Sequence, residues 1–267
     1  MQYFIDNLAE PRRISPMSAF MSPFQALAMM FNVPGMFTVA ILSGLVCLLS
    51  SPVPFLAFFL IPMALGLVMA KTVSAIHGSS SGWQELNTWV YARLKLRVWI
   101  FALMILPPLL LIFGSIINLM QNFGEPGARN FSAVYCVIGA IFFSAIWGLV
   151  LFTANFQALQ EKNGISVSCI RAISLLKMNV IPMIVMLVNW FMELAFFYFI
   201  LASAVIAGPY IFGSMGSLAV NIFNLVFLFI AGSFFLSHYL VTLGILGYQI
   251  YAAAADDSSA EDKAAQP

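Results

Sequence analysis

Charge is what this sequence has least of. Asp, Glu, Lys and Arg make up only 8% of its 267 residues, whereas 62% are hydrophobic and the mean hydropathy is +0.99. A soluble domain carries about 25% charged residues, and so apolar a chain would expose large apolar patches to water. The composition therefore excludes an ordinary soluble domain and indicates a multi-span membrane protein. The net charge of +1 also gives no general attraction for nucleic acid, so we expect no nucleic-acid partner.

Cysteine and histidine are scarce as well. Cys47, Cys136 and Cys169 lie far apart, and His77 and His238 are the two histidines. Neither set has the spacing of a metal site or of a disulfide framework. No stretch carries a catalytic or cofactor motif. We therefore expect no metal, no cofactor and no enzymatic activity.

Long apolar runs dominate what is present. A helix needs about 20 apolar residues to cross the hydrocarbon core, and these runs lack the alternation of membrane strands. We predict an all-α fold, a polytopic membrane bundle of six transmembrane helices within one domain, 17–251. A cytoplasmic segment, 1–16, precedes it, and an acidic tail, 252–267, follows and is expected to be disordered. The expected spans are 33–50, 54–76, 98–119, 131–156, 180–206 and 218–248.

The basic residues give the orientation. With six spans, ten of the eleven Lys and Arg residues fall on one side of the membrane, and Arg129 alone falls on the other. The positive-inside rule then places both termini in the cytoplasm, and we expect a multi-pass protein of the bacterial inner membrane.

A short amphipathic segment precedes each pair of spans. The first, 17–31, contains Ser22 and Pro23 as a helix-start signal and ends at Asn32-Val33-Pro34-Gly35. The second, 83–97, is opened by Ser81 and Gln84 as a capping box. The third is 165–178. We interpret all three as interfacial helices. If the first crossed the membrane, every later segment would be inverted, and the basic residues between the second and third spans would lie outside the cytoplasm.

Two of the breaks suggest a family. The run from Ala26 to Phe37, with Asn32-Val33-Pro34-Gly35, resembles the entry of the YciC-like inner-membrane proteins of bacteria. In those proteins the entry motif occurs a second time, and that second copy is similar to Ser174, Lys177, Asn179 and Pro182 of this sequence. A basic residue expected just before Asn32 is replaced by Met30 and Phe31. The resemblance implies a six-span inner-membrane protein of unsettled function and supplies no mechanism.

Glu193 is the outstanding residue, because it is the only acidic side chain within the six expected spans and lies in the middle of the fifth. A charge at the bilayer centre costs about 2.5 to 3.5 kcal/mol on insertion scales. Asn189, four residues earlier on the same helix face, is a candidate partner. Two interpretations stay open: a proton-coupled or cation site, and a neutral carboxylic acid that joins helices.

Other polar residues complete the candidate sites. Asn221, Asn224 and His238 lie in the last span, where we expect hydrogen bonds to another helix. Arg93, Lys95 and Arg97 form the densest basic cluster and are candidate lipid-headgroup contacts.

These observations favour a scaffold or accessory factor of the bacterial envelope, with membrane lipids as partners and either a membrane-protein partner or a homo-oligomer left open. The alternative is a small transporter or lipid translocator with a polar site around Glu193. The transporter hypothesis predicts that Glu193 lines a water-reachable cavity. A Glu193 bonded to a neighbouring helix favours the scaffold.

Overall fold

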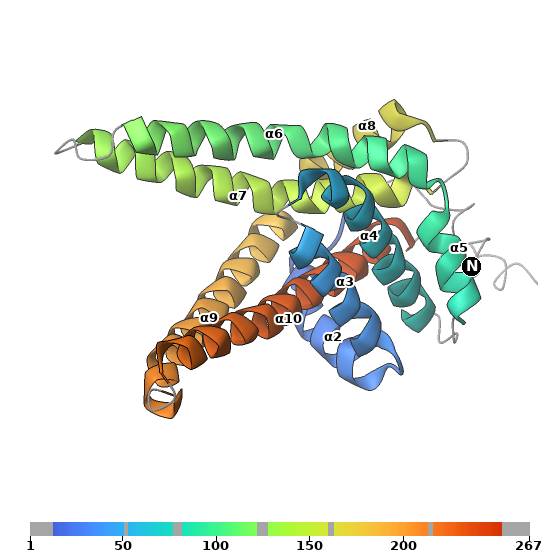
Figure 1. Ribbon diagram of the computed structural model, residues 1–267. Helices are drawn as coiled ribbons and strands as arrows, with labels where there is room; N and C mark the ends of the chain where they lie inside the picture. The colour runs from blue at the N-terminus through green and yellow to red at the C-terminus, as the bar shows by residue number, and fades with distance from the viewer. Residues whose placement is uncertain are drawn as a thin grey trace, which may run out of the picture.

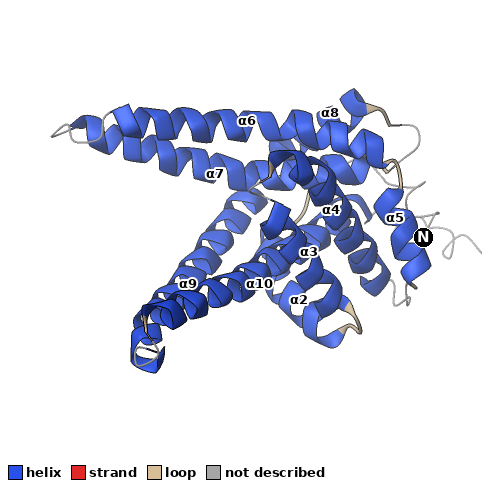
Figure 2. Ribbon diagram, viewed as in Figure 1, coloured by secondary structure: helices blue, strands red, loops and turns tan. Residues whose placement is uncertain are grey.

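The computed structural model describes residues 13–50, 53–76, 82–121, 128–159, 163–212 and 216–252, and the regular elements in these ranges are all helices (Figure 2). This confirms the predicted all-α helical bundle. The parts 1–12 and 253–267 of the expected terminal segments lie outside the described residues. The helices are α2 (Pro16–Asn32), α3 (Met36–Ser50), α4 (Pro54–Ile76), α5 (Trp83–Tyr91), α6 (Leu94–Gln121), α7 (Ala128–Gln157), α8 (Ile165–Met178), α9 (Val180–Phe212) and α10 (Ser217–Ala252).

Five of these helices, α4, α6, α7, α9 and α10, are long and apolar enough to cross a membrane. The first expected span, 33–50, corresponds to α3, whose 15 residues extend only about 22 Å and so fall short of the hydrocarbon core. Together α2 and α3 meet the same criterion, but they are bent by 114° at the break between them. The described residues therefore contain five helices able to span a membrane, or six spans if α2 and α3 form one broken span.

Helix α2 begins earlier than the sequence signal placed it. It starts at Pro16, and the N-cap is Ser15, whose side-chain oxygen accepts a hydrogen bond from the Ser18 amide at 3.0 Å. Pro23 consequently lies inside the helix rather than at its first position. Because proline has no amide hydrogen, the Ala19 carbonyl loses its helical donor. The Ser22 hydroxyl donates to that carbonyl at 2.9 Å, which partly replaces the missing bond.

The second short segment is also divided differently. We expected one helix over 83–97, but α5 ends at Tyr91 and α6 begins at Leu94. Arg93 between them has φ 48°, in the left-handed region, which ends one helix and turns the chain into the next. Gly82 is the N-cap of α5, and Ser81 of the expected capping box lies outside the described residues.

The chain is organised as three units, each a short helix followed by a hairpin of long helices (Figure 1). The hairpins are α3–α4, α6–α7 and α9–α10. Each short helix packs mainly against the hairpin of the unit before it: α5 against α4, α8 against α6 and α7, and α2 against α9 and α10. The first short helix thus lies on the last hairpin, so the packing closes on itself and joins the beginning of the chain to its end.

The buried core lies where α2, α3, α4 and α10 meet. Met30, Met36, Met69 and Leu246 are almost fully buried there. Gly44 lets α3 approach α10, since a Cβ at this position would collide with the Ser237 side chain. From this core the α6–α7 and α9–α10 hairpins diverge (Figure 1). Their outer parts expose large apolar side chains, as expected of surfaces that face lipid.

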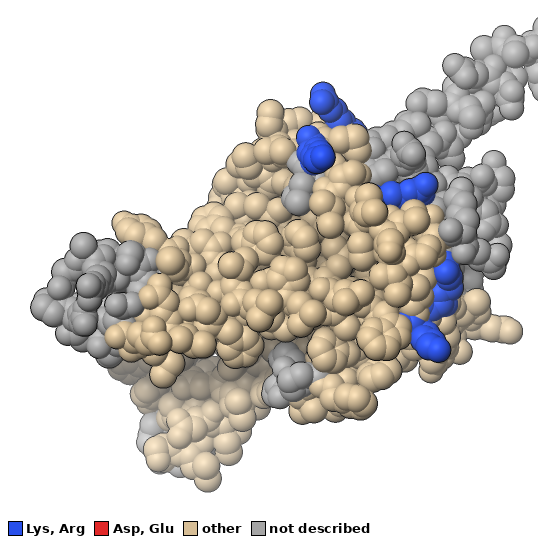
Figure 3. All heavy atoms as spheres, turned by 90° about the horizontal axis from the view of Figure 1, so that it is seen from above, with Lys and Arg blue, Asp and Glu red and all other residues tan. Residues whose placement is uncertain are grey.

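The described Lys and Arg residues are unevenly placed. Figure 3 shows the basic side chains in view gathered toward one end of the molecule, away from the far ends of the long hairpins. The contributing elements are the end of α4, the α5–α6 junction and α8. The fold therefore has one basic end, which matches the asymmetry counted along the sequence.

Candidate functional site

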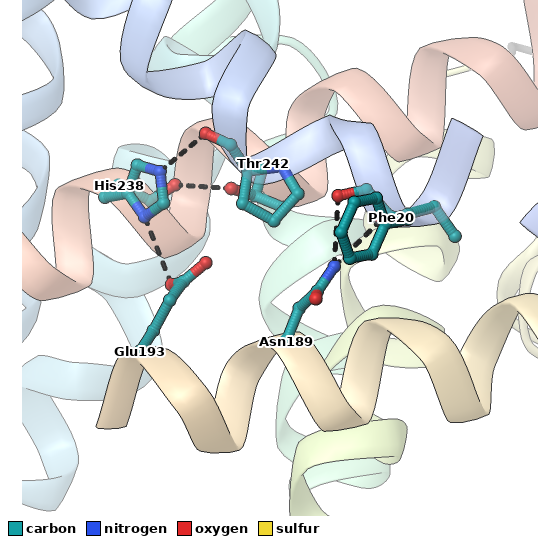
Figure 4. Close-up of polar contacts among 7 residues, drawn as sticks. Phe20, Asn189, Glu193, His238 and Thr242 are labelled. Atoms are coloured by element: carbon teal, nitrogen blue, oxygen red, sulfur yellow. Dashed lines mark hydrogen bonds and ion pairs between the residues drawn. The ribbon is translucent and has the colours of Figure 1, made fainter. Parts of the chain in front are cut away.

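A chain of polar contacts joins three helices inside the bundle. Glu193 lies on α9 and His238 on α10, and Glu193 Oε2 is 3.1 Å from His238 Nδ1. The other ring nitrogen, Nε2, is 2.8 Å from the carbonyl oxygen of Pro23 in α2. The His238 side chain is 12% exposed and that of Glu193 is 22% exposed. Figure 4 shows Glu193 directed from its helix toward the imidazole. We call these three residues the α2 clamp.

The two partners of His238 limit where the protons of its ring can lie. A carbonyl oxygen only accepts hydrogen bonds, so Nε2 must carry a hydrogen and donate it to Pro23. One further proton then lies between Nδ1 and Oε2, either on the acid, which donates to a neutral imidazole, or on an imidazolium, which donates to a carboxylate. The pair has no net charge in either arrangement. It thereby avoids the cost of an isolated carboxylate in the membrane.

Asn189 reinforces the same helix contact one turn earlier on α9. Its side-chain nitrogen donates to the Phe20 carbonyl at 3.1 Å and lies 3.5 Å from the Ala19 carbonyl (Figure 4). Ala19 O is the acceptor that Pro23 leaves without its helical donor. Asn189, the candidate partner of Glu193, is instead held by the backbone of α2.

Aromatic side chains pack around the clamp. Tyr239 follows His238 and its ring centroid lies 6.4 Å from that of Trp190, while the Phe191 ring is tilted against that of Phe142 of α7, with their centroids 4.1 Å apart. Gly148 of α7 gives Tyr239 room, since a Cβ there would come within 2.9 Å of the tyrosine hydroxyl. These contacts close the α7–α9–α10 interface beside the polar pair.

The two remaining predicted polar residues lie elsewhere. Asn221 and Asn224 line an open hollow of about 320 Å³ between α9 and α10, toward the far end of that hairpin. The Asn224 side-chain oxygen is buried, and none of the described residues forms a hydrogen bond with it. Neither this hollow nor the smaller one beside Asn179 is lined by Glu193 or His238. The residues that we predicted to form one polar site therefore lie in two separate places.

The basic cluster also divides. Arg97 is fully buried, and its terminal nitrogens donate to the carbonyls of Val90, at 3.1 Å, and Pro62. The prediction that Arg97 contacts lipid headgroups is therefore wrong, because the side chain holds α5 and α4 against α6. Arg93 is half-buried and donates to the Ala158 carbonyl at 3.0 Å, whereas Lys95 is exposed.

Sequence reasoning missed the pairing of Glu193 with His238 and the backbone acceptors of α2. A signal for the pairing is present. Glu193 lies 19 residues before the end of α9 at Phe212, and His238 lies 21 residues after the start of α10 at Ser217. Residues at matching distances from the turn of a helical hairpin lie at similar depth. For one of the α2 acceptors, the Ala19 carbonyl, Pro23 is a signal in the sequence, because a proline lacks the amide hydrogen that would bond to that carbonyl within the helix.

The fold and these contacts define a polytopic α-helical protein with several helices suited to a membrane. We compared the chain with models of protein families, with curated proteins and with solved structures, and none of them matches it.

Proposed function

We propose that the protein is an integral membrane scaffold or accessory factor without enzymatic activity. The observation that carries this proposal is the set of hydrogen bonds that the intramembrane polar groups form. Glu193, His238 and Asn189 all bond to α2 or to one another. Such bonds fix the relative positions of helices, which is what a scaffold requires, and they leave these groups engaged rather than directed at a substrate.

We further propose that the protein lies in the inner membrane of a bacterium with both termini in the cytoplasm. The gathering of Lys and Arg at one end of the fold supports this orientation (Figure 3). The three-unit layout and the Asn32 and Asn179 breaks support kinship with the YciC-like proteins. The exposed apolar faces of the α6–α7 and α9–α10 hairpins are available to lipids and to a membrane-protein partner.

Water access at Glu193 tests the scaffold against a transporter or lipid translocator. In a variant whose three cysteines are replaced by Ala, Glu193→Cys is exposed to a membrane-impermeant, water-soluble thiol reagent. The scaffold proposal expects labelling as slow as at Val241→Cys, a fully buried position of α10. Labelling as fast as at the exposed Gly164→Cys would support a water-filled path and overturn the scaffold proposal.

A partner is tested by photocrosslinking in intact cells. A photoreactive amino acid at Tyr198, which is 73% exposed on α9, is expected to give a discrete adduct with a membrane protein or a second copy of the chain. The same amino acid at the buried Met186 serves as the control and is expected to give none. Adducts with lipid alone from every exposed position of α6 and α9 would contradict a scaffold role.

A further inference from the structure

The α3–α4 hairpin is shorter than the two hairpins beside it. α3 has 15 residues and α4 has 23, whereas α6, α7, α9 and α10 have 28 to 36. Figure 1 shows α3 and α4 beside the part of the fold from which the longer hairpins diverge. The level that the α3–α4 turn reaches along its neighbours therefore decides whether this hairpin crosses the membrane. We call the membrane boundary at the basic end the near boundary and the opposite one the far boundary.

Contacts with α6 give one measure of that level. The uncharged run of α6, 98–117, has 20 residues and extends about 30 Å, the thickness of the hydrocarbon core. Arg97 at its near end bonds to the Pro62 carbonyl of α4, and Phe101, the fourth residue of the run, has its ring centroid 6.3 Å from that of Phe58. The helices are therefore antiparallel, and α4 begins four residues before Phe58. This places the turn about 10 Å inside the near boundary.

Contacts with α10 give a second measure. A Cβ at Gly44 would collide with Ser237, and one at Gly232 would come within 3.6 Å of Leu48, so α3 is antiparallel to α10. Gly232 is 15 residues, or about 22 Å, from the start of α10, and α3 extends only two residues beyond Leu48, to Ser50. The turn is thus about 20 Å from the start of α10. With that start at the far boundary, the turn again lies about 10 Å inside the near one.

The apolarity of α4 is explained by contact with protein. Half of its most apolar stretch is buried within the fold, against 11 to 22% for the corresponding stretches of α6, α7, α9 and α10. Lys71, Thr72 and Ser74 are among its buried residues, and polar groups of this kind are costly in a lipid-spanning segment. Neighbouring helices, rather than acyl chains, therefore cover much of α4.

The turn itself suits an apolar environment. Of the four residues from Ser51 to Pro54, two are prolines, which have no amide hydrogen. The Val53 amide donates to the Ser50 carbonyl at 3.0 Å, and the Ser50 hydroxyl donates to the Cys47 carbonyl at 3.3 Å. The sequence from 36 to 70 contains no charged residue. The turn therefore contains few backbone donors, as a turn within hydrocarbon requires.

Helix α2 lies across the start of this hairpin. It is bent by 114° from α3 and contains no charged residue, and its exposed surface has two stripes. Gln25 belongs to the polar stripe, and its Oε1 accepts a hydrogen bond at 3.4 Å from Gln249, close to the end of α10 at the basic side. An in-plane helix at a membrane boundary has such a surface. The polar stripe is Ser18, Gln25 and Asn32, and the apolar stripe is Met17, Phe20, Phe24, Leu27 and Phe31.

We propose that the first unit, α2 with the α3–α4 hairpin, is an anchor in one leaflet of the membrane. α2 lies in the membrane plane at the near boundary, and α3–α4 enters about a third of the hydrocarbon core and returns to the same side. The partner of this surface is the acyl-chain region of the leaflet at the basic end. Only α6–α7 and α9–α10 cross, and four crossings leave both ends of the chain on one side. This anchor does not depend on the scaffold proposal.

Spin labels on the full-length chain in lipid vesicles test the depth of the turn. In the variant whose three cysteines are replaced by Ala, nitroxides are attached at Val53→Cys, at Leu103→Cys of α6 and at Tyr210→Cys near the far end of α9, all exposed positions. Accessibility to oxygen and to a water-soluble nickel complex reports depth. We expect Val53→Cys to match Leu103→Cys, about 8 Å inside the near boundary, and Tyr210→Cys to be accessible to nickel.

Paired labels identify the leaflet. Leu103 and Ile116 are 13 residues, or about 20 Å, apart on α6, and both are exposed. The Val53→Cys label should lie closer to Leu103→Cys than to Ile116→Cys. A nickel accessibility as high as that of Tyr210→Cys, or a shorter distance to Ile116→Cys, would overturn the re-entrant hairpin. Circular dichroism and gel filtration show whether each variant is folded, and the exposed Leu49→Cys replaces Val53→Cys if that variant is not.

Two adjacent residues test the placement of α2. Phe24 lies on the apolar stripe and Gln25 on the polar one, and both are exposed. A label at Phe24→Cys should be accessible to oxygen and protected from nickel, whereas one at Gln25→Cys should be accessible to nickel. Equal accessibility to nickel at the two positions would overturn the in-plane placement of α2.

Discussion

His238 Nε2 donates to the carbonyl oxygen of Pro23 over 2.8 Å, although 215 residues separate the two in the chain. This bond joins the first described helix to the last. It uses an acceptor within a helix that already contains a proline, and it places the imidazole between that acceptor and Glu193. The His238 side chain therefore links α2 to both helices of the last hairpin.

Removal of that side chain should loosen α2. We expect His238→Ala to lower the free energy of unfolding by about 1 to 2 kcal/mol, because it leaves Glu193 without its partner in an apolar interior. His238→Gln should recover part of the loss, since an amide can still donate to Pro23. Thermal unfolding in detergent measures both. Thr242→Val removes only a bond to the His238 backbone, at 2.9 Å, and is the matched control; a shift as large as that of His238→Ala would contradict the clamp.

Glu193 should matter as a hydrogen-bonding partner rather than as a charge. Gln at this position can donate to the neutral imidazole, so Glu193→Gln should unfold close to the unmodified protein, whereas Glu193→Ala should be destabilised. A double-mutant cycle of Glu193→Ala with His238→Ala should give a coupling energy of about 0.6 to 1.7 kcal/mol. Additive effects would mean that the 3.1 Å contact contributes nothing to stability.

Pro23 and Asn189 should be coupled through the backbone. Pro23→Ala restores the amide that normally donates to the Ala19 carbonyl, so α2 then needs the Asn189 side chain less. We expect Asn189→Leu to cost about 1 kcal/mol in the unmodified chain and clearly less in the Pro23→Ala background. Chemical or thermal unfolding of the four proteins in the cycle measures the difference. An equal cost in both backgrounds would show that Asn189 acts only through its 3.1 Å bond to the Phe20 carbonyl.

The sequence predicts the features that local composition determines. Apolar runs of sufficient length define the helices, and the order of short helix and hairpin is visible because each break is marked locally, as at Asn32 and Asn179. Which hairpin receives α2 is a long-range outcome that periodicity does not encode. The contact between His238 and Pro23 therefore could not be derived from either residue's neighbourhood.

The basic cluster shows a second reason for failure. The sequence treated 83–97 as one helix with Arg93 and Arg97 directed toward headgroups. A left-handed residue at Arg93 breaks that helix and changes the direction of everything after it. Arg97 consequently enters the bundle, where Gly66 leaves space for it. A single backbone angle therefore decided whether a charged residue was buried or exposed.

Arg97 and Lys95 should therefore differ in what they affect. A Cβ at Gly66 would come within 2.5 Å of the Arg97 guanidinium, so Gly66→Ala should destabilise the protein by about 1 to 3 kcal/mol. Arg97→Met should remove most of that penalty, which a double-mutant cycle by thermal unfolding detects. Lys95→Ala should leave stability unchanged but weaken binding to vesicles or nanodiscs containing anionic lipid, because its side chain is exposed. If Arg97→Met weakened anionic-lipid binding more than Lys95→Ala did, with the fold intact, Arg97 would be a headgroup contact and not a buried link between α4, α5 and α6.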